Sequence, residues 1–393
     1  MLPPTGAREQ MQAYATKLTC FCSAAIFLCA LGIGTATARE SAEPYDLEQL
    51  YTLAKRACPT SSLACFQDQF STVTAKNGPG ATIALFTLLQ TRGDIRPTVD
   101  GHHIAHHIGH ETAMDFGPTA EALALCPDSY NYGCMHGFFQ HALGMGALSS
   151  QAAAKICDGL QGPGYPGKTW QSCYHGFGHG VMLYAGYDIP KALGVCDTLQ
   201  SPPAQEACWQ GAFMENVDVA LEGDWKKASF SRDDPLAPCD QIDAKHQFEC
   251  YFNQPGWLLH FYHNDVAAAA QACLKAAPDA VRPCMESLGL LTTSPAWQAR
   301  LLGPDKGSGA FLQNAWRLCQ TFPAGHVGQC VRGAADNLMN TATAEQAKAF
   351  CGAVDDAYRD ACTTRINNDL DYLSVQKPKP QPDAAATVPG NLH

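Results

Sequence analysis

Alanine-rich and apolar stretches recur along the chain, and turn-forming residues separate each one from the next. Residues 152–157 and 344–351 are rich in helix-forming side chains, and each stretch ends in a cysteine. Gly and Pro residues commonly follow, and a second cysteine comes after them. This is a pattern of helix, turn and helix, and it predicts an all-α chain built from two-helix hairpins.

The cysteines mark the same repeat. Without the N-terminal segment described below, sixteen cysteines remain, and they fall into eight close pairs. No C-x-x-C pair is present and exported proteins keep few free thiols, so we expect disulfides rather than metal thiolates. The count alone allows other connectivities, but the repeat predicts pairing between near neighbours. The expected disulfides are Cys58–Cys65, Cys126–Cys134, Cys157–Cys173, Cys196–Cys208, Cys239–Cys250, Cys273–Cys284, Cys319–Cys330 and Cys351–Cys362.

The second cysteines of these pairs recur every 32 to 46 residues between Cys134 and Cys362. Such a period is typical of helical-hairpin solenoids, in which each hairpin buries its apolar face only against its neighbours. We therefore expect a disulfide-stapled hairpin repeat that forms an α-solenoid or a toroid. Each disulfide closes a loop of about a dozen residues, which in the chain-entropy model stabilises the fold by about 3 kcal/mol.

The N-terminal residues 1–38 have the features of a signal peptide. Arg8 and Lys17 are basic, residues 18–33 are apolar, and residues 36–38 form an A-x-A cleavage site. The apolar run of about 16 residues is shorter than the roughly 20 that a membrane-spanning helix needs, although a retained anchor is the alternative. We expect a periplasmic or secreted protein without stable membrane insertion after signal cleavage.

The rest of the chain divides into four segments. We expect N-terminal helical repeats with the histidine-rich site at residues 39–222, and a long connection at residues 223–238. C-terminal helical repeats should follow at residues 239–375, and the proline-rich residues 376–393 should form a disordered tail.

The charge of the chain argues against one class of partner. The formal net charge is -11, and removal of a segment with two basic residues and one acidic residue leaves -12. A protein that binds nucleic acid needs a basic surface, so we expect no nucleic-acid partner.

Most of the fourteen histidines lie between His102 and His179, and this clustering is the strongest functional signal in the sequence. The first group lies in a segment that we expect to be helical. At about 100° per residue, its members His102, His103, His106 and His110 fall within an arc of about 100°.

Two further groups occupy the same position in successive repeats. His136 and His175 each lie two residues after the second cysteine of a pair, and Gln140 and His179 lie four residues further on. These side chains should point away from the disulfide and share one face of the stack. The next repeat has Gln210 where the earlier ones have histidine, so histidine is not needed to build a repeat and serves something local.

Two histidines four residues apart on a helix can chelate one ion, and His106/His110 and His175/His179 have this spacing. Facing helices of this kind are similar in spacing to coupled dicopper oxygen-binding sites. Nearby glycines should let the helices approach closely; they are Gly137, Gly176, Gly178 and Gly180. The candidate metal ligands are His102, His103, His106, His110, His136, His175 and His179, enough for one crowded ion or a dinuclear centre.

Imidazole ligands suit transition metals, whereas magnesium and calcium prefer oxygen donors. Export favours copper or zinc, with iron as a further candidate. The structural alternative is that each histidine is an ordinary hydrogen-bonded side chain, and we assign this role to His107 and His141, which fall off the shared face.

Three functions are compatible with such a site. The leading hypothesis is a metal-dependent oxidoreductase with an all-histidine copper or iron site. The first alternative is a zinc-dependent hydrolase, in which Glu215 could act as the base; Glu215 and Gln140 are the candidate catalytic residues. The second alternative is a periplasmic metal-binding or protein-interaction solenoid without turnover. Buried aromatics should wall the pocket: Phe138, Phe139, Tyr174 and Phe177. The sequence specifies neither the substrate, whether small molecule or peptide, nor the oligomeric state.

Overall fold

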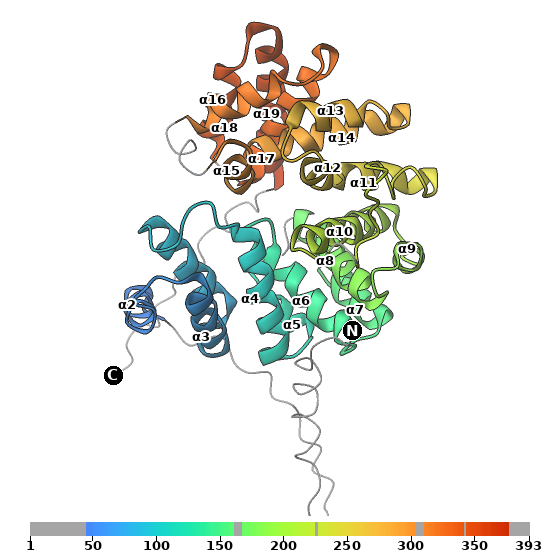
Figure 1. Cartoon of the computed structure of the whole chain (residues 1–393). Coiled ribbons are helices and arrows are strands. Elements are labelled where there is room, and N and C mark those ends of the chain that lie inside the picture. Colours follow the sequence, from blue (N-terminus) through green and yellow to red (C-terminus); the bar gives the residue numbers. More distant parts are fainter. Residues whose placement is uncertain (1–44, 161–166, 225–226, 304–309, 342, 377–393) are drawn as a thin grey trace, which may run out of the picture. The chain divides into compact units, whose positions relative to one another are not determined.

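The regular structure of the described residues is helical, as the alternation of alanine-rich stretches and turns predicts (Figure 1). The computed structural model describes residues 45–160, 167–224, 227–303, 310–341 and 343–376. The expected signal peptide and all but the first residue of the expected tail lie outside them. The helices are α2 Leu47–Ala57, α3 Leu63–Thr91, α4 Gly101–Phe116, α5 Ala120–Leu123, α6 Gly133–Gly144, α7 Ser150–Asp158, α8 Gly167–Tyr184, α9 Ile189–Cys196, α10 Pro202–Leu221, α11 Ala244–Asn253, α12 Pro255–Phe261, α13 Val266–Cys273, α14 Pro278–Thr292, α15 Pro295–Leu302, α16 Phe311–Cys319, the 3-10 helix η1 Ala324–His326, α17 Val327–Thr341, α18 Ala344–Ala353 and α19 Asp356–Gln376.

Short polar side chains fix where several helices begin. The carboxylates of Asp100, Asp188 and Asp265 accept backbone N–H groups in the first turns of α4, α9 and α13. Thr343 and Gln346 form a reciprocal capping box at the start of α18. Such a cap is worth about 1 kcal/mol because it satisfies a donor that has no partner within the helix. The cap at Asp100 sets the start of the helix that carries the first histidine group.

All eight predicted disulfides are present, with Cα–Cα distances of 5.4 to 5.8 Å. Most join the end of a short first helix to the early part of a longer second helix, as between α7 and α8 or between α13 and α14. Cys239 differs, because it lies in the long connection before α11 and no short helix comes directly before it. So many disulfides indicate an oxidising compartment.

The longer helices of successive hairpins pack against one another in chain order. α4 contacts α6, α6 contacts α8, and α8 contacts α10, while α14 contacts α17 further along the chain. This is the neighbour-to-neighbour packing that a tandem repeat requires, so the predicted all-α, disulfide-stapled fold is confirmed. Whether the repeats form a solenoid or a toroid stays a prediction. None of the described helices is long and apolar enough to cross a membrane.

The predicted long connection corresponds to the stretch between α10 and α11. Within it, Phe230 stacks on Trp257 with ring centroids 4.4 Å apart, and the backbone N–H of Ser229 donates to the side-chain oxygen of Asn216 at 2.9 Å. Residues 41–393 group into one unit by their contacts. The division into repeats before and after the connection stays a prediction.

Glycines bring the longer helices unusually close together, as the sequence predicts. A Cβ atom at Gly137 would lie 1.7 Å from the backbone oxygen of His106, and one at Gly178 would lie 2.1 Å from the backbone oxygen of Cys208. Gly180 approaches Phe139 in the same way, at 2.3 Å. Because a side chain cannot be accommodated at these positions, backbone rests directly on backbone, and the histidines of neighbouring helices come within reach of one another.

Candidate metal centre

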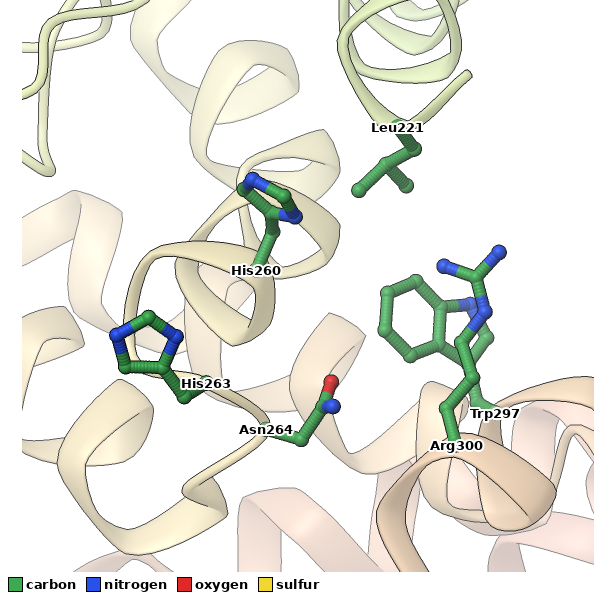
Figure 2. A pocket seen from close by; sticks show the side chains of 6 residues that line it. All are labelled: Leu221, His260, His263, Asn264, Trp297 and Arg300. Carbon is green, nitrogen blue, oxygen red and sulfur yellow. The ribbon is translucent and has the colours of Figure 1, made fainter. Parts of the chain in front are cut away.

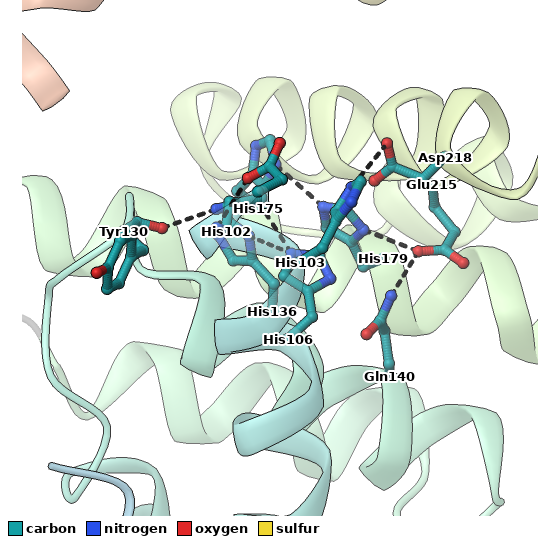
Figure 3. Close-up of polar contacts among 11 residues, drawn as sticks. His102, His103, His106, Tyr130, His136, Gln140, His175, His179, Glu215 and Asp218 are labelled. Carbon is teal, nitrogen blue, oxygen red and sulfur yellow. Dashed lines mark hydrogen bonds and ion pairs between the residues drawn. The ribbon is translucent and has the colours of Figure 1, made fainter. Parts of the chain in front are cut away.

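Five imidazoles from three consecutive long helices converge in one cluster (Figure 3). His102 and His106 come from α4, His136 from α6, and His175 and His179 from α8. They form two groups of three that share His136, namely His102, His106 and His136, and His136, His175 and His179. Within each group the potential ligand nitrogens all lie within 4.8 Å of one another.

The closest nitrogen pairs have the spacing of ligands on a common ion. His106 Nε2 lies 3.0 Å from His102 Nε2 and 3.3 Å from His136 Nδ1. His179 Nε2 lies 3.2 Å from His175 Nε2. Two nitrogens bound to one Zn²⁺ at about 2.05 Å would be about 3.3 Å apart in tetrahedral geometry and about 2.9 Å apart at a right angle. The three separations fall within or close to this interval.

Hydrogen bonds on the outer side of the cluster orient three of the rings. His102 Nδ1 faces the backbone oxygen of Tyr130 at 2.7 Å, and His175 Nδ1 faces the side-chain oxygen of Gln210 at 3.0 Å. His179 Nδ1 lies 2.9 Å from Glu215 Oε2. All three partners are acceptors, so in each ring Nδ1 carries the proton and Nε2 presents a bare lone pair to the cluster. Metal-bound histidines are held in the same way.

A cation between His175 and His179 would satisfy both rings as they are oriented here. With both Nδ1 atoms protonated, two lone pairs on Nε2 face each other across 3.2 Å, which is repulsive unless a positive charge lies between them. A rotation of the Gln210 amide would present its NH₂ group to His175 and remove this repulsion. The Glu215 carboxylate can only accept a hydrogen bond, so no rotation of it would change the position of the proton on His179. The donor set thus fits a transition metal ion.

Glu215 is itself held firmly. It is 5% exposed, and Oε2 accepts hydrogen bonds from His179 and from Gln140 Nε2, at 2.9 and 2.7 Å. The hydroxyl group of Tyr187 donates to Oε1 at 3.1 Å. Glu215 and Gln140, the two candidate catalytic residues, therefore lie next to each other behind His179, as Figure 3 shows.

Burial lowers the pKa of His102, His106, His136 and His175, and so favours their neutral form. His136, His175 and His179 are 4%, 8% and 0% exposed. Burial lowers the pKa of His175 to about 3, with a smaller contribution from neighbouring His179. Burial, and then the other imidazoles, also bring the pKa values of His106 and His136 well below the usual range. Neutral imidazole is the form that binds metal, so these ligands need not lose a proton at neutral pH.

Two of the seven candidate ligands lie outside both groups of three. His103 Nε2 points to Asp218 Oδ1 at 3.7 Å, and this ion pair raises the pKa of His103 to about 9. His110 Nε2 instead lies 3.2 Å from Nδ1 of His141. The structure therefore pairs His106 with His102, the other residue four positions away, rather than with His110 as the sequence suggested.

Apart from Glu215 and Gln140, the residues that surround the ligands are not predicted by the sequence pattern. Asp218 lies on α10, and its Oδ2 atom is buried without a hydrogen-bond partner among the described residues. Gln210 orients His175, and it occupies the repeat position at which the two earlier repeats have histidine. This equivalence was one signal in the sequence. The eight-residue spacing between Gln210 and Asp218 on one helix was the other. Tyr130 and Tyr187 act from turns, for which helix periodicity gives no signal.

The four aromatic residues expected to wall the site belong to the apolar core, where they pack edge to face on one another; they are Phe138, Phe139, Tyr174 and Phe177.

Comparison of the whole chain with known proteins gave no match to a family model, to a curated protein or to a solved structure. The function must therefore be argued from the site itself.

Proposed function

We propose that the protein is an exported metal-dependent oxidoreductase whose five-histidine cluster holds copper or iron. The observation that carries this proposal is the pair of three-histidine groups sharing His136, with nitrogen separations that suit a common ion. Two groups of three provide enough donors for two adjacent ions. Glu215 supplies nearby negative charge that would offset part of the charge of bound cations.

The choice of metal follows from the donors. An all-imidazole set suits copper, iron or zinc, and it disfavours magnesium and calcium. Copper or iron would supply one-electron chemistry, which zinc cannot. The residues of the chain would fix the rings: Tyr130, Gln210 and Glu215 hold the Nδ1 protons, and the close helix contacts exclude water.

The zinc hydrolase receives less support from this geometry. A hydrolase needs a carboxylate that is free to take a proton from metal-bound water. Glu215 lies on the far side of His179 and accepts three hydrogen bonds, so it fits a positioning role better than that of a base.

Burial favours a second candidate function, metal binding without turnover. His179 is fully buried and its two neighbours in the group nearly so, which leaves little access for a substrate larger than a few atoms. The two candidates share the metal site and differ only in whether the bound ion reacts.

The test is a spectroscopic redox titration of the mature, oxidised protein loaded with copper. The X-ray absorption edge of the bound copper should shift with ascorbate and return in air, and this cycle should be lost in His136→Ala, which removes the shared ligand, but kept in His263→Ala. Tightly bound zinc that copper cannot replace, or equal behaviour of the two variants, would contradict the proposal. A bound copper ion that does not cycle would leave metal binding alone.

A further inference from the structure

A second site lies on a part of the chain to which the proposed function gives no role. A cavity of about 300 Å³ opens between the end of α10, the turn after α12, and α15. It is lined by Leu221, His260, His263, Asn264, Trp297 and Arg300 (Figure 2). A volume of this size is at the lower end of pockets that hold small molecules.

The lining combines cationic and donor groups with an apolar wall. The guanidinium of Arg300 lies over the ring of Trp297, 5.1 Å from its centroid. None of the ion pairs of the described residues includes Arg300. The acid nearest in sequence to His263 is Asp265, and its carboxylate caps α13 by accepting the N–H of Ala268.

Figure 2 shows His260 and His263 facing Trp297 and Arg300 across the cavity, with Leu221 and Asn264 between them. The guanidinium of Arg300 and the side-chain amide of Asn264 can both donate to one anionic group. Leu221 and Trp297 offer apolar surface to the rest of a ligand. The lining therefore matches a molecule that is anionic at one end and apolar at the other.

The turn beside the cavity places a histidine in a backbone conformation that favours glycine. After α12, His263 has a φ of 53°, and its N–H donates to the carbonyl of His260, three residues earlier. Four longer helices, α3, α6, α8 and α10, end with the same hydrogen bond, and in each the residue at this position is a glycine with positive φ; these are Gly93, Gly146, Gly186 and Gly223. Glycine adopts this conformation without strain, whereas histidine does not. Strained residues of this kind cluster at ligand sites.

From the cavity and the histidine in its strained turn, we infer that this site binds a small organic carboxylate. Arg300 binds the carboxylate, Asn264 and His263 add hydrogen bonds, and Trp297 and Leu221 contact the apolar body. The site shares no residue with the histidine cluster, so it stands whether or not the proposed metal chemistry is correct.

The test uses the mature protein with its disulfides intact, and benzoate as the probe. Saturation-transfer NMR and calorimetric titration should show saturable binding of benzoate and much weaker binding of the neutral analogue benzyl alcohol. Arg300→Gln should weaken benzoate binding by about tenfold or more, because a charge-assisted pair is lost. The matched control Arg96→Gln removes an exposed arginine elsewhere and should leave binding unchanged.

The decisive variant is His263→Gly, which restores the residue that the equivalent turns use. It should raise or preserve the thermal unfolding temperature and still weaken benzoate binding several-fold, whereas a purely structural histidine would leave binding unchanged. The inference is overturned if benzoate does not bind at millimolar concentration, if Arg300→Gln binds as Arg96→Gln does, or if His263→Gly retains full affinity. Equal binding of inorganic phosphate would overturn the assignment of an organic ligand.

Discussion

Replacing Gly137 by alanine should separate the two helices that carry the first group of ligands. The new Cβ atom would lie 1.7 Å from the backbone oxygen of His106, whereas side-chain carbons essentially never approach closer than 3.0 Å. α4 and α6 would therefore have to move apart by about 1.3 Å. The distance from His106 Nε2 to His136 Nδ1, now 3.3 Å, would rise toward about 4.6 Å, which is too wide for two ligands of one tetrahedral ion.

The magnitude follows from two opposing effects. Overpacking of this kind costs about 1–3 kcal/mol, and alanine regains up to about 1 kcal/mol of helix propensity over glycine. The net loss of unfolding free energy should be about 1–2 kcal/mol. Loss of one ligand contact should weaken metal binding further, by at least about tenfold, or about 1.4 kcal/mol.

The chain contains a matched control for this variant. A Cβ atom at Gly333 would also lie 1.7 Å from a backbone oxygen, that of Glu286, but in the contact between α14 and α17, which carries no cluster histidine. Gly333→Ala should therefore lose similar stability and keep its metal affinity. The two variants are compared by thermal unfolding and by competition with a chromophoric chelator. If both bind metal equally well, the link between glycine packing and ligand geometry is refuted.

Three further predictions test other parts of the account. Glu215→Gln should weaken metal binding by about 10–100-fold in chelator competition while Glu111→Gln does not, because only Glu215 orients a clustered imidazole; equal losses would contradict the role of Glu215. Burial, with repulsion from Glu206, raises the pKa of Glu249 to about 8, so the folded state keeps a proton that the unfolded state loses above about pH 4.3. Stability should thus fall by up to about 1.4 kcal/mol per pH unit between these values, and Glu249→Gln should flatten this slope in denaturant titrations; an unchanged slope would refute the assignment. Reduction of the disulfides should abolish cooperative thermal unfolding followed by circular dichroism, since each closed loop contributes about 3 kcal/mol, and a retained sharp transition would show that packing alone suffices.

Much of the fold could be predicted from the sequence because each cysteine pair marks the junction between the two helices of a hairpin. A pair such as Cys273 and Cys284 must lie at the junction of two helices, and the spacing repeats along the chain. Glycines such as Gly137 and Gly178 likewise showed where helices meet, because only a missing side chain allows that contact. The overall arrangement of repeats depends on small rotations between neighbours, which leave no mark on composition or spacing.

The candidate site could be predicted only in part. The 100° rotation per residue of a helix predicts that His102, His103, His106 and His110 share one arc. It does not specify which of them face α6. That choice depends on how α4 crosses α6 and α8, which brings His102 and His106 to His136 and leaves His110 to His141. The acceptors behind the rings come from elements distant in sequence, so only the tertiary structure reveals them.

The most direct test of the central claim is elemental analysis by mass spectrometry of protein purified from its native compartment without chelator or histidine tag. The wild type should hold about two equivalents of copper or iron, His106→Ala about one, and His136→Ala almost none, because His136 belongs to both groups. A wild-type protein without transition metal, or a His136→Ala variant that keeps its full metal content, would contradict the account.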